Sequence, residues 1–182
     1  FANREADILL GTQMIVKGHD FPGVTLMGIL AADLSLSNND FRAAERTFQL
    51  LTQAAGRAGR GELPGEVVIQ TYQPEHYAIV RASGQDYEGF YEEELAYREF
   101  LLYPPAANMM AVQLSGPDEK SLERLGQRLA TEVKAIEFDS MPAQIGPAKA
   151  NLSKKSDLYR QVIYYKHKDY EELVHIKDRM EE

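Results

Sequence analysis

Apolar residues in the first seventy positions form two short continuous runs and then a helical stripe. The runs Ala6–Gly11 and Val24–Ala32 predict buried central strands of a parallel sheet, covered on both faces. Asp40 is a helix-capping residue type, and the apolar positions after it recur at helical spacing. Gly56 and Gly59 end that helix, and Glu66–Tyr72 predicts a third strand. The stripe consists of Phe41, Ala44, Phe48, Leu51 and Ala55. This order predicts half of an α/β layer, the partial lobe of a larger parallel-sheet domain.

A break at Gln73-Pro74 separates these strands from a helical region. Glu75–Arg81 predicts a short helix, and a strongly acidic helix begins at Asp86. The prolines in Tyr103-Pro104-Pro105 stop that helix, because proline lacks a backbone donor and clashes with the preceding turn. We therefore predict a domain boundary here, with one domain over 1–104 and a second over 105–182.

The second predicted domain has a β-α-β-β-α pattern. Met109–Leu114 alternates like a strand, and a helical stripe follows the turn Ser115-Gly116-Pro117-Asp118. Two further strands, Gln144–Asn151 and Leu158–Tyr165, are joined through residues 152–157, and Tyr170–Arg179 predicts a final helix. The pattern indicates a small two-layer α+β domain. The stripe consists of Leu122, Leu125, Leu129, Val133 and Ile136.

Composition and charge narrow the possible environments and partners. The chain lacks cysteine, which rules out disulfides and thiolate metal sites within it, and we expect no metal ligands here. No apolar run reaches the roughly 18–20 residues of a membrane span, so we expect no membrane partner and a cytoplasmic location. The net charge is −8, yet residues 149–168 hold six Lys or Arg residues against Asp157 alone. A locally basic face can bind phosphate even on an acidic protein.

The segment 49–61 carries the clearest candidate chemistry. Its core, Q-x-x-G-R-x-G-R, places Gln53 before two arginines that each follow a glycine, Arg57 and Arg60. A guanidinium matches phosphate oxygens, and glycine lets a ligand approach the backbone closely. The segment resembles the sixth motif of superfamily 2 helicases. That resemblance implies that Gln53 faces the nucleotide and that Arg57 and Arg60 reach the triphosphate, one of them as an arginine finger. The alternative is a glycine-rich helix end with two solvated arginines.

A second motif, residues 11–22, follows the first predicted strand. Ligands of open α/β sheets bind at the carboxyl ends of strands. Thr12 and Gln13 can donate to phosphate oxygens, Lys17 with Gly18 offers a charge and an exposed amide, and Asp20 can accept from a ribose hydroxyl or orient an arginine. The segment resembles the fifth helicase motif, which links the nucleic-acid backbone to the nucleotide site. A polar turn with a surface lysine is the alternative.

Two further sets of residues are candidates for polar or DNA contacts. Asp33 follows a predicted strand and is placed for polar contacts, while Arg42 and Arg46 can contact DNA or simply lie on a helix surface. In the basic hairpin, Lys154 and Lys155 lie at the predicted tip with Arg160 beside them, so cations could hold phosphates while tyrosines stack on bases. The tyrosines could instead pack on the domain's own helix. Alternation places Tyr159, Gln161, Ile163 and Tyr165 on one face, and Arg160, Val162, Tyr164 and Lys166 on the other.

Taken with these motifs, several later segments make the whole chain resemble the bacterial primosomal replication-restart helicases, the primosomal protein N-prime family. The segments are Pro64–Thr71, Arg98-Glu99 with Tyr103-Pro104-Pro105, Ile145–Ala148 and Tyr159-Arg160-Gln161. The resemblance implies an ATP-dependent 3′-to-5′ DNA helicase that uses ATP with Mg²⁺. It also implies branched and single-stranded DNA, single-stranded-DNA-binding protein and primosome proteins as partners, and a location at the bacterial nucleoid.

The sequence departs from a complete motor of this family. It contains no G-x-x-x-x-G-K-[ST] phosphate loop and no acidic Walker B pair, and it begins at Phe1, so we expect a piece of a longer protein. The family's zinc sites would lie upstream. The piece alone is expected to bind no ATP or zinc and to be inactive as an enzyme. The rival hypothesis is a non-catalytic module that binds nucleic acid or replication proteins.

Overall fold

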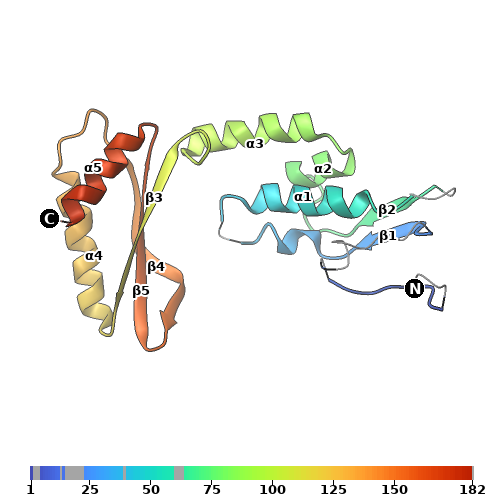
Figure 1. Cartoon of the computed structure of the whole chain (residues 1–182), viewed down its shortest axis with the longest axis horizontal. Helices are drawn as coiled ribbons and strands as arrows, with labels where there is room; N and C mark the ends of the chain where they lie inside the picture. The colour runs from blue at the N-terminus through green and yellow to red at the C-terminus, as the bar shows by residue number, and fades with distance from the viewer. Residues whose placement is uncertain (2–4, 13, 15–22, 39, 60–63, 182) are drawn as a thin grey trace. The chain divides into compact units, whose positions relative to one another are not determined.

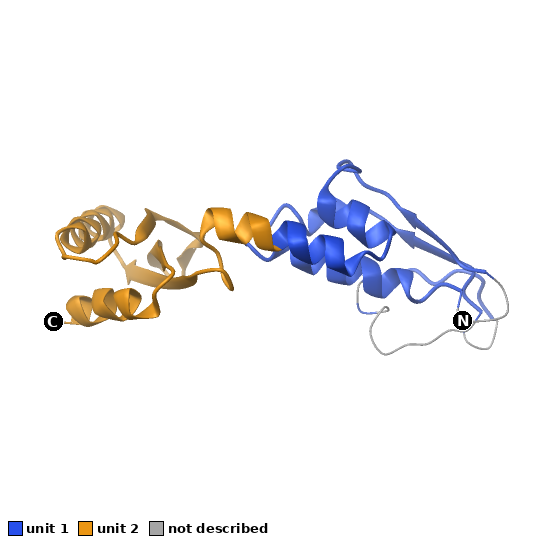
Figure 2. Ribbon diagram, turned by 90° about the horizontal axis from the view of Figure 1, so that it is seen from above, with its two compact units in different colours: residues 1–94 blue, residues 95–182 orange. Residues whose placement is uncertain are grey.

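The chain forms two compact units, which Figure 2 shows in different colours. This computed structural model describes residues 1, 5–12, 14, 23–38, 40–59 and 64–181. The first unit is Phe1–Glu94 and the second is Leu95–Glu182. The division falls within a helix, α3 (Tyr87–Leu101), whereas the sequence-based boundary lies just after that helix. The functional division at 104 stays a prediction.

The first unit contains a small parallel sheet with helices on one face. Strands β1 (Leu26–Ile29) and β2 (Glu66–Ile69) pair in parallel, which confirms the predicted strand type. Their crossover contains the 3-10 turn η2 (Ala32–Leu34) and helix α1 (Ala43–Ala55), and α2 (Tyr77–Ser83) follows β2 (Figure 1). The helices and sheet share one apolar core, formed by Ala32, Phe48, Leu51, Ala78, Ile79, Ala82 and Phe90.

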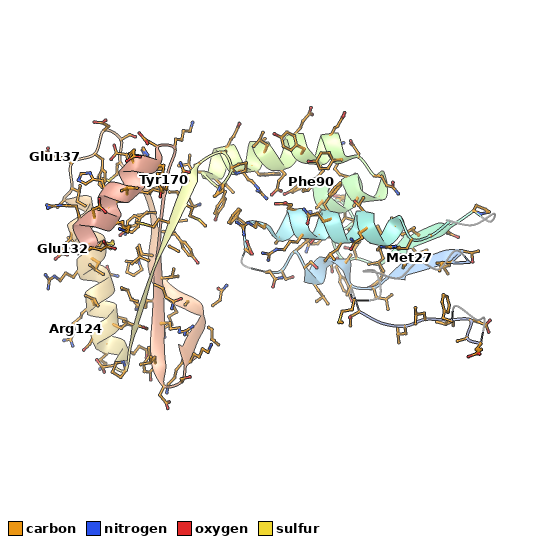
Figure 3. All side chains as sticks on the ribbon, in the orientation of Figure 1. Met27, Phe90, Arg124, Glu132, Glu137 and Tyr170 are labelled. Carbon is orange, nitrogen blue, oxygen red and sulfur yellow. The ribbon has the colours of Figure 1, made fainter. Side chains whose placement is uncertain are left out.

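Aromatic stacking joins α1 to the first turns of α3. The rings of Phe48 and Phe90 stack with centroids 4.1 Å apart, and Figure 3 labels Phe90 in this region. On the same side of α3, Glu94 is buried and accepts a 2.5 Å hydrogen bond from the Tyr77 hydroxyl. Burying a carboxylate requires such a partner. The acidic helix is therefore partly a packing element and not only a solvated face.

The sheet of the first unit is less buried than the apolar runs predict. Residues 6–11 form no strand, and Ile8 and Leu10 are 85% and 86% exposed. Leu26 and Val68 are also exposed, so the expectation of strands covered on both faces is wrong for the residues described here. The physical reason is that a parallel strand is buried only when neighbouring strands and a second layer cover it. The described sheet has two strands, and the described helices pack on one face of it.

The predicted helix limits are confirmed with one correction at the start. Asp40 is not the capping residue, because α1 begins at Ala43 and Arg42 occupies the N-cap position without a side-chain hydrogen bond. Asp40 instead stabilises the preceding turn by accepting from the backbone N–H of Arg42 at 3.0 Å. At the other end, Gly56 is the C-cap residue and Gly59 has a positive φ of 73°.

The second unit has the predicted β-α-β-β-α order. Strands β3 (Asn108–Gly116), β4 (Ala143–Lys155) and β5 (Leu158–His167) form an antiparallel sheet in the order β3-β5-β4. Helices α4 (Glu119–Lys134) and α5 (Tyr170–Glu181) pack on one face of it (Figure 1). Asp118 caps α4 by accepting from the N–H of Ser121 at 2.7 Å. The core between helices and sheet is formed by Ala130, Val133, Ile163, Tyr165, Leu173 and Ile176.

The β4–β5 connection is shorter than the sequence indicates. The strands continue to Lys155 and restart at Leu158, so only Ser156 and Asp157 connect them, not residues 152–157. Both connecting residues have positive φ, 51° and 62°. Positive φ at both central positions defines a type I′ turn, whose twist matches that of the flanking strands.

Candidate nucleotide and nucleic-acid sites

The Gly-Arg motif forms the tight turn between α1 and β2. Gln53 is exposed on the last turn of α1, and Arg57, four positions on, is half-buried in the turn that follows. The turn is fixed by backbone hydrogen bonds from Arg57 to Ala54, at 3.0 Å, and from Gly59 to Val24, at 3.1 Å. These bonds hold the Gly-Arg segment against Val24, two residues before β1. Arg60 lies outside the described residues.

The two glycines of this motif have different structural roles. A Cβ on Gly59 would lie 2.8 Å from the backbone nitrogen of Gly65, and its φ of 73° already disfavours other residues. A Cβ on Gly56 would make only ordinary contacts, the closest at 3.5 Å to the carbonyl of Thr52. The fold therefore requires glycine at 59, where two backbone segments meet. At 56 the described structure has room for a side chain.

The structure places Thr12, of the second motif, beside the face of α1. Thr12 is exposed, and its hydroxyl accepts from the backbone N–H of Met14 at 3.4 Å. It lines a hollow of about 380 Å³ with residues of β1 and α1, among them Gly28, Thr47 and Leu50. The lining residues do not include Gln53 or Arg57. The other candidates, Gln13, Lys17, Gly18 and Asp20, lie outside the described residues.

Asp33 connects the carboxyl ends of the two parallel strands. Its Oδ1 accepts from the Thr71 hydroxyl and, at 2.9 Å, from the backbone N–H of Tyr72. The hydrogen bond from Thr71 is the main cause that lowers the pKa of Asp33 below its ordinary value, against the opposing effect of burial. The predicted polar contacts of Asp33 are therefore made within the fold, where they fix the crossover after β1.

The structure does not bring Arg42 to the Gly-Arg motif. Arg42 lies at the start of α1 and Arg57 just beyond its end, and a helix of 13 residues is about 20 Å long. Arg42 is exposed, with its guanidinium 4.8 Å from the centre of the Phe41 ring. Arg46 pairs with Asp40 at 2.8 Å. A contact of Arg42 with DNA would therefore use a surface separate from the nucleotide motif.

The hairpin candidates lie at the far end of the β4–β5 ladder. Lys154 is paired with Tyr159, its ammonium lies 5.2 Å from the ring centre, and it also forms a 3.2 Å ion pair with Asp157. Lys155 is exposed beside the turn. Arg160 is half-buried, and its Nε is buried with no hydrogen-bond partner in the part of the chain that the structure describes. Cations and an aromatic ring therefore share this end of the sheet.

The predicted alternation along β5 is confirmed, but one lysine is not available to a ligand. Gln161, Ile163 and Tyr165 are buried towards the helices, so Tyr165 is a core residue. Lys166 is only 4% exposed, although it is one of the six cations of the basic segment 149–168. Its Nζ donates to the Leu101 carbonyl at 3.0 Å and lies 3.3 Å from the centre of the Tyr103 ring. This lysine stabilises the second unit and does not line its surface.

A basic groove between α4 and β4 is absent from the sequence-based expectations. It has a volume of about 720 Å³ and is lined by Lys120, Arg124, Lys149 and Gln161 among others. Lys149 pairs with Glu119 at 2.7 Å across it. The signal that could have indicated it is Gln161, a polar residue at a core-facing position of β5.

The described residues contain no cluster of three or more His, Asp or Glu side chains able to hold a metal ion. No helix within the described ranges combines the length and the apolar character that a membrane crossing requires.

Sequence comparison relates nearly the whole chain to one group of proteins. Replication restart protein PriA of Bacillus subtilis is 44% identical over 173 residues, which is 95% of this chain. PriA of Synechocystis is 41% identical over 170 residues, and PriA of Borreliella burgdorferi is 36% identical over all 182. The chain is homologous to part of PriA. The predicted family resemblance is thereby confirmed.

The homology covers both units but only a small part of each relative. The chain spans 21% of the Bacillus PriA and 27% of the Borreliella PriA, or about a fifth to a quarter of their length. No protein-family model matches the chain. The activities of a complete PriA protein therefore belong to a larger molecule than the one described here.

Proposed function

We propose that this chain is the last part of the second motor lobe, followed by the C-terminal DNA-binding domain, of an ATP-dependent 3′-to-5′ DNA helicase that restarts stalled replication forks. The observation that carries the proposal is the 44% identity to a PriA protein over 95% of the chain. The parallel β1–β2 pair with its α1 crossover supports assigning residues 1–104 to a RecA-like lobe. The separate α+β unit supports a second domain over 105–182.

In this proposal Arg57 and Arg60 act on the nucleotide from the second lobe. A cationic side chain aimed at the transferring phosphoryl group stabilises its charge in the transition state. The position of Arg57 supports such a role, because it is half-buried in a turn that Gly59 anchors to Val24, two residues before β1, so its backbone is held in place. Gln53, exposed one turn earlier, would contact the same nucleotide.

The test is the ATPase rate of the intact protein carrying Arg57→Ala. Loss of an arginine finger commonly lowers kcat by about 10³-fold or more, so we expect near-complete loss of DNA-stimulated hydrolysis with DNA binding retained. Arg128→Ala is the control, because Arg128 is an exposed arginine on α4 whose ion pair with Glu132 is local. An Arg57→Ala enzyme with the ATPase rate of the unaltered protein would overturn the role assignment.

Cofactors and partners follow from the same proposal. ATP with Mg²⁺ would bind the complete protein, whereas this chain lacks the phosphate loop and is expected to be inactive alone. Zinc would bind upstream. The expected partners are branched and single-stranded DNA, single-stranded-DNA-binding protein and primosome proteins, in the bacterial cytoplasm. Lys154, Lys155 and Arg160, with Arg42 on the first unit, are the proposed DNA contacts.

The rival hypothesis is a non-catalytic binding module, and the two hypotheses differ in what they predict for the full-length protein. It predicts that no upstream phosphate loop exists and that ATPase activity is absent from the intact protein. Reading the full gene and measuring that activity separate the two.

A further inference from the structure

The groove between α4 and the edge strand β4 has an unpaired polar group at its base. Gln161 is only 7% exposed, and its Oε1 has no hydrogen-bond partner among the residues described. Gly126 of α4 packs directly over it, since a Cβ there would lie 2.6 Å from Oε1. A buried polar atom without a partner costs free energy, and a change of rotamer that turns the Gln161 amide towards a ligand in the groove recovers that cost.

Cationic side chains line the same groove as Gln161. Lys120 and Arg124 line the groove from α4, where Figure 3 labels Arg124, and Lys149 lines it from β4. The ammonium of Lys149 pairs with Glu119 at 2.7 Å. Lys149 faces Gln161 across the β4–β5 ladder, and Lys154 faces Tyr159, two residues earlier on β5, and contacts its ring. The groove therefore lies next to the hairpin cations along the same pair of strands.

The combination of these groups selects a type of ligand. An amide offers a donor and an acceptor side by side, which is the pattern that base edges complement. Cations along a groove hold a phosphate backbone, and a half-buried tyrosine such as Tyr159 can offer the exposed part of its ring to an unpaired base. Glu119 and Glu123 lie beside these cations and reduce the positive charge of the groove. Charge alone would therefore attract DNA only weakly, and the hydrogen bond to the base has to contribute to the affinity. A duplex keeps its bases stacked inside, whereas a single strand can place one base in a groove.

We propose that the α4–β4 groove binds one nucleotide of single-stranded DNA, with its base hydrogen-bonded to the Gln161 amide once that side chain has turned into the groove, and its neighbouring phosphates on Lys149, Lys120 and Arg124. The strand then continues past Tyr159 to the hairpin. The proposal deepens the DNA-binding role proposed for this domain and rests on it.

The experiment is fluorescence anisotropy of the full chain with a labelled oligothymidylate of about 15 nucleotides, within the range that small single-strand-binding folds cover. The variants are Arg124→Glu and Gln161→Leu, and the control is Arg128→Glu, one turn further along α4 and not in the groove. We expect each groove variant to raise Kd at least about fivefold, as for loss of one base or phosphate contact, and the control to change it less than about twofold. Circular dichroism checks that the variants fold.

Photocrosslinking gives a second readout that does not depend on a variant. An oligonucleotide carrying 5-iododeoxyuridine should crosslink to peptides containing Gln161 or Gln127, both of which line the groove. If Gln161→Leu fails to fold, the crosslinks and Arg124→Glu decide the question.

Three other results would each overturn the groove proposal, and each would assign a different role to the domain. Unchanged Kd in both groove variants, with binding lost only in Lys154→Glu/Lys155→Glu, would leave the hairpin as the DNA site and the proposed function intact. A groove that binds an aspartate-rich peptide and no DNA would be a protein-docking site. If the chain binds no DNA even at low salt, the proposed DNA-binding role of the domain fails with it, while the ATPase test of Arg57 still stands.

Discussion

At the scale of single residues, the Gly-Arg motif contains a glycine that the fold needs and one that it does not. Gly59→Ala places a Cβ 2.8 Å from the nitrogen of Gly65 at a φ of 73°, so we expect it to lower the free energy of unfolding by about 1–3 kcal/mol. Gly56→Ala is the matched control, with its closest contact at 3.5 Å and an expected change below about 1 kcal/mol. Urea unfolding of the two variants compares them. Equal destabilisation would contradict this reading.

If Gly56→Ala is stable but impairs ATP hydrolysis in the intact protein, its glycine serves the ligand and not the fold. A glycine that the structure leaves room to replace is a candidate for close approach of a phosphate to the backbone.

Tyr165 offers a second test at this scale, because it is a core residue whose hydroxyl has no hydrogen-bond partner among the residues that the structure describes. It is fully buried, and burial raises its pKa to about 12. Removing the hydroxyl with Tyr165→Phe should therefore raise the free energy of unfolding by about 1 kcal/mol at pH 7. Tyr164→Phe, on the opposite face of β5, should have little effect.

The same residue predicts how stability depends on pH. Since the folded pKa of Tyr165 lies above its ordinary value of 10, its ionisation does not affect stability below about pH 10, and the free energy of unfolding falls as the pH rises from about 10 towards 12. Denaturant unfolding at pH 7 and pH 11 should show a larger loss in the unaltered chain than in Tyr165→Phe. The same loss in both would show that Tyr165 is not the titrating group.

At the scale of elements, the β4–β5 turn contains residue types that are not the ones its backbone conformation prefers. Ser156 and Asp157 both have positive φ, for which Asn-Gly is the preferred pair. Replacing them by Asn-Gly should raise the melting temperature, by the equivalent of about 0.5–1 kcal/mol. The lost ion pair to Lys154 matters little, because the Asp157 side chain is 96% exposed. Ser156→Pro, which fixes φ near −65°, should lower the melting temperature. A lower melting temperature for the Asn-Gly variant would contradict the turn assignment.

Helices and strands were predictable from the sequence where the local pattern of apolar residues matches their burial within one unit. The stripe on α1, the β-α-β-β-α order and the alternation along β5 reflect burial within one unit. The strand expected over residues 6–11 was wrong, because its burial depends on neighbours that the described sheet does not have. Lys166 was misread for a related reason, since only the folded chain brings Leu101 and Tyr103 over it. The groove at Gln161 likewise needs α4 and β4 together.

At the scale of the whole molecule, the distribution of charge decides how an acidic protein can bind DNA. The net charge of −8 opposes binding, while residues 149–168 carry a local excess of cations. Of these, Lys149 and Lys154 are ion-paired and Lys166 is buried, so the hairpin presents fewer free cations than the sequence count implies. A small number of phosphate contacts gives a modest salt dependence, because each contact releases about one counterion.

Fluorescence anisotropy over a salt series measures the number of phosphate contacts directly. For single-stranded DNA, the slope of log K against log salt is about −0.7 per phosphate contact, so the slope counts how many of the proposed groove and hairpin cations bind phosphates. Lys154→Glu/Lys155→Glu should weaken binding at every salt concentration and make the slope shallower by about 1.4. The charge-matched control is Arg128→Glu/Lys177→Glu, on residues of α4 and α5 that pair with carboxylates of their own helices. If the control flattens the slope as much as the hairpin variant does, then net charge, and not the hairpin, governs the binding of DNA to this chain.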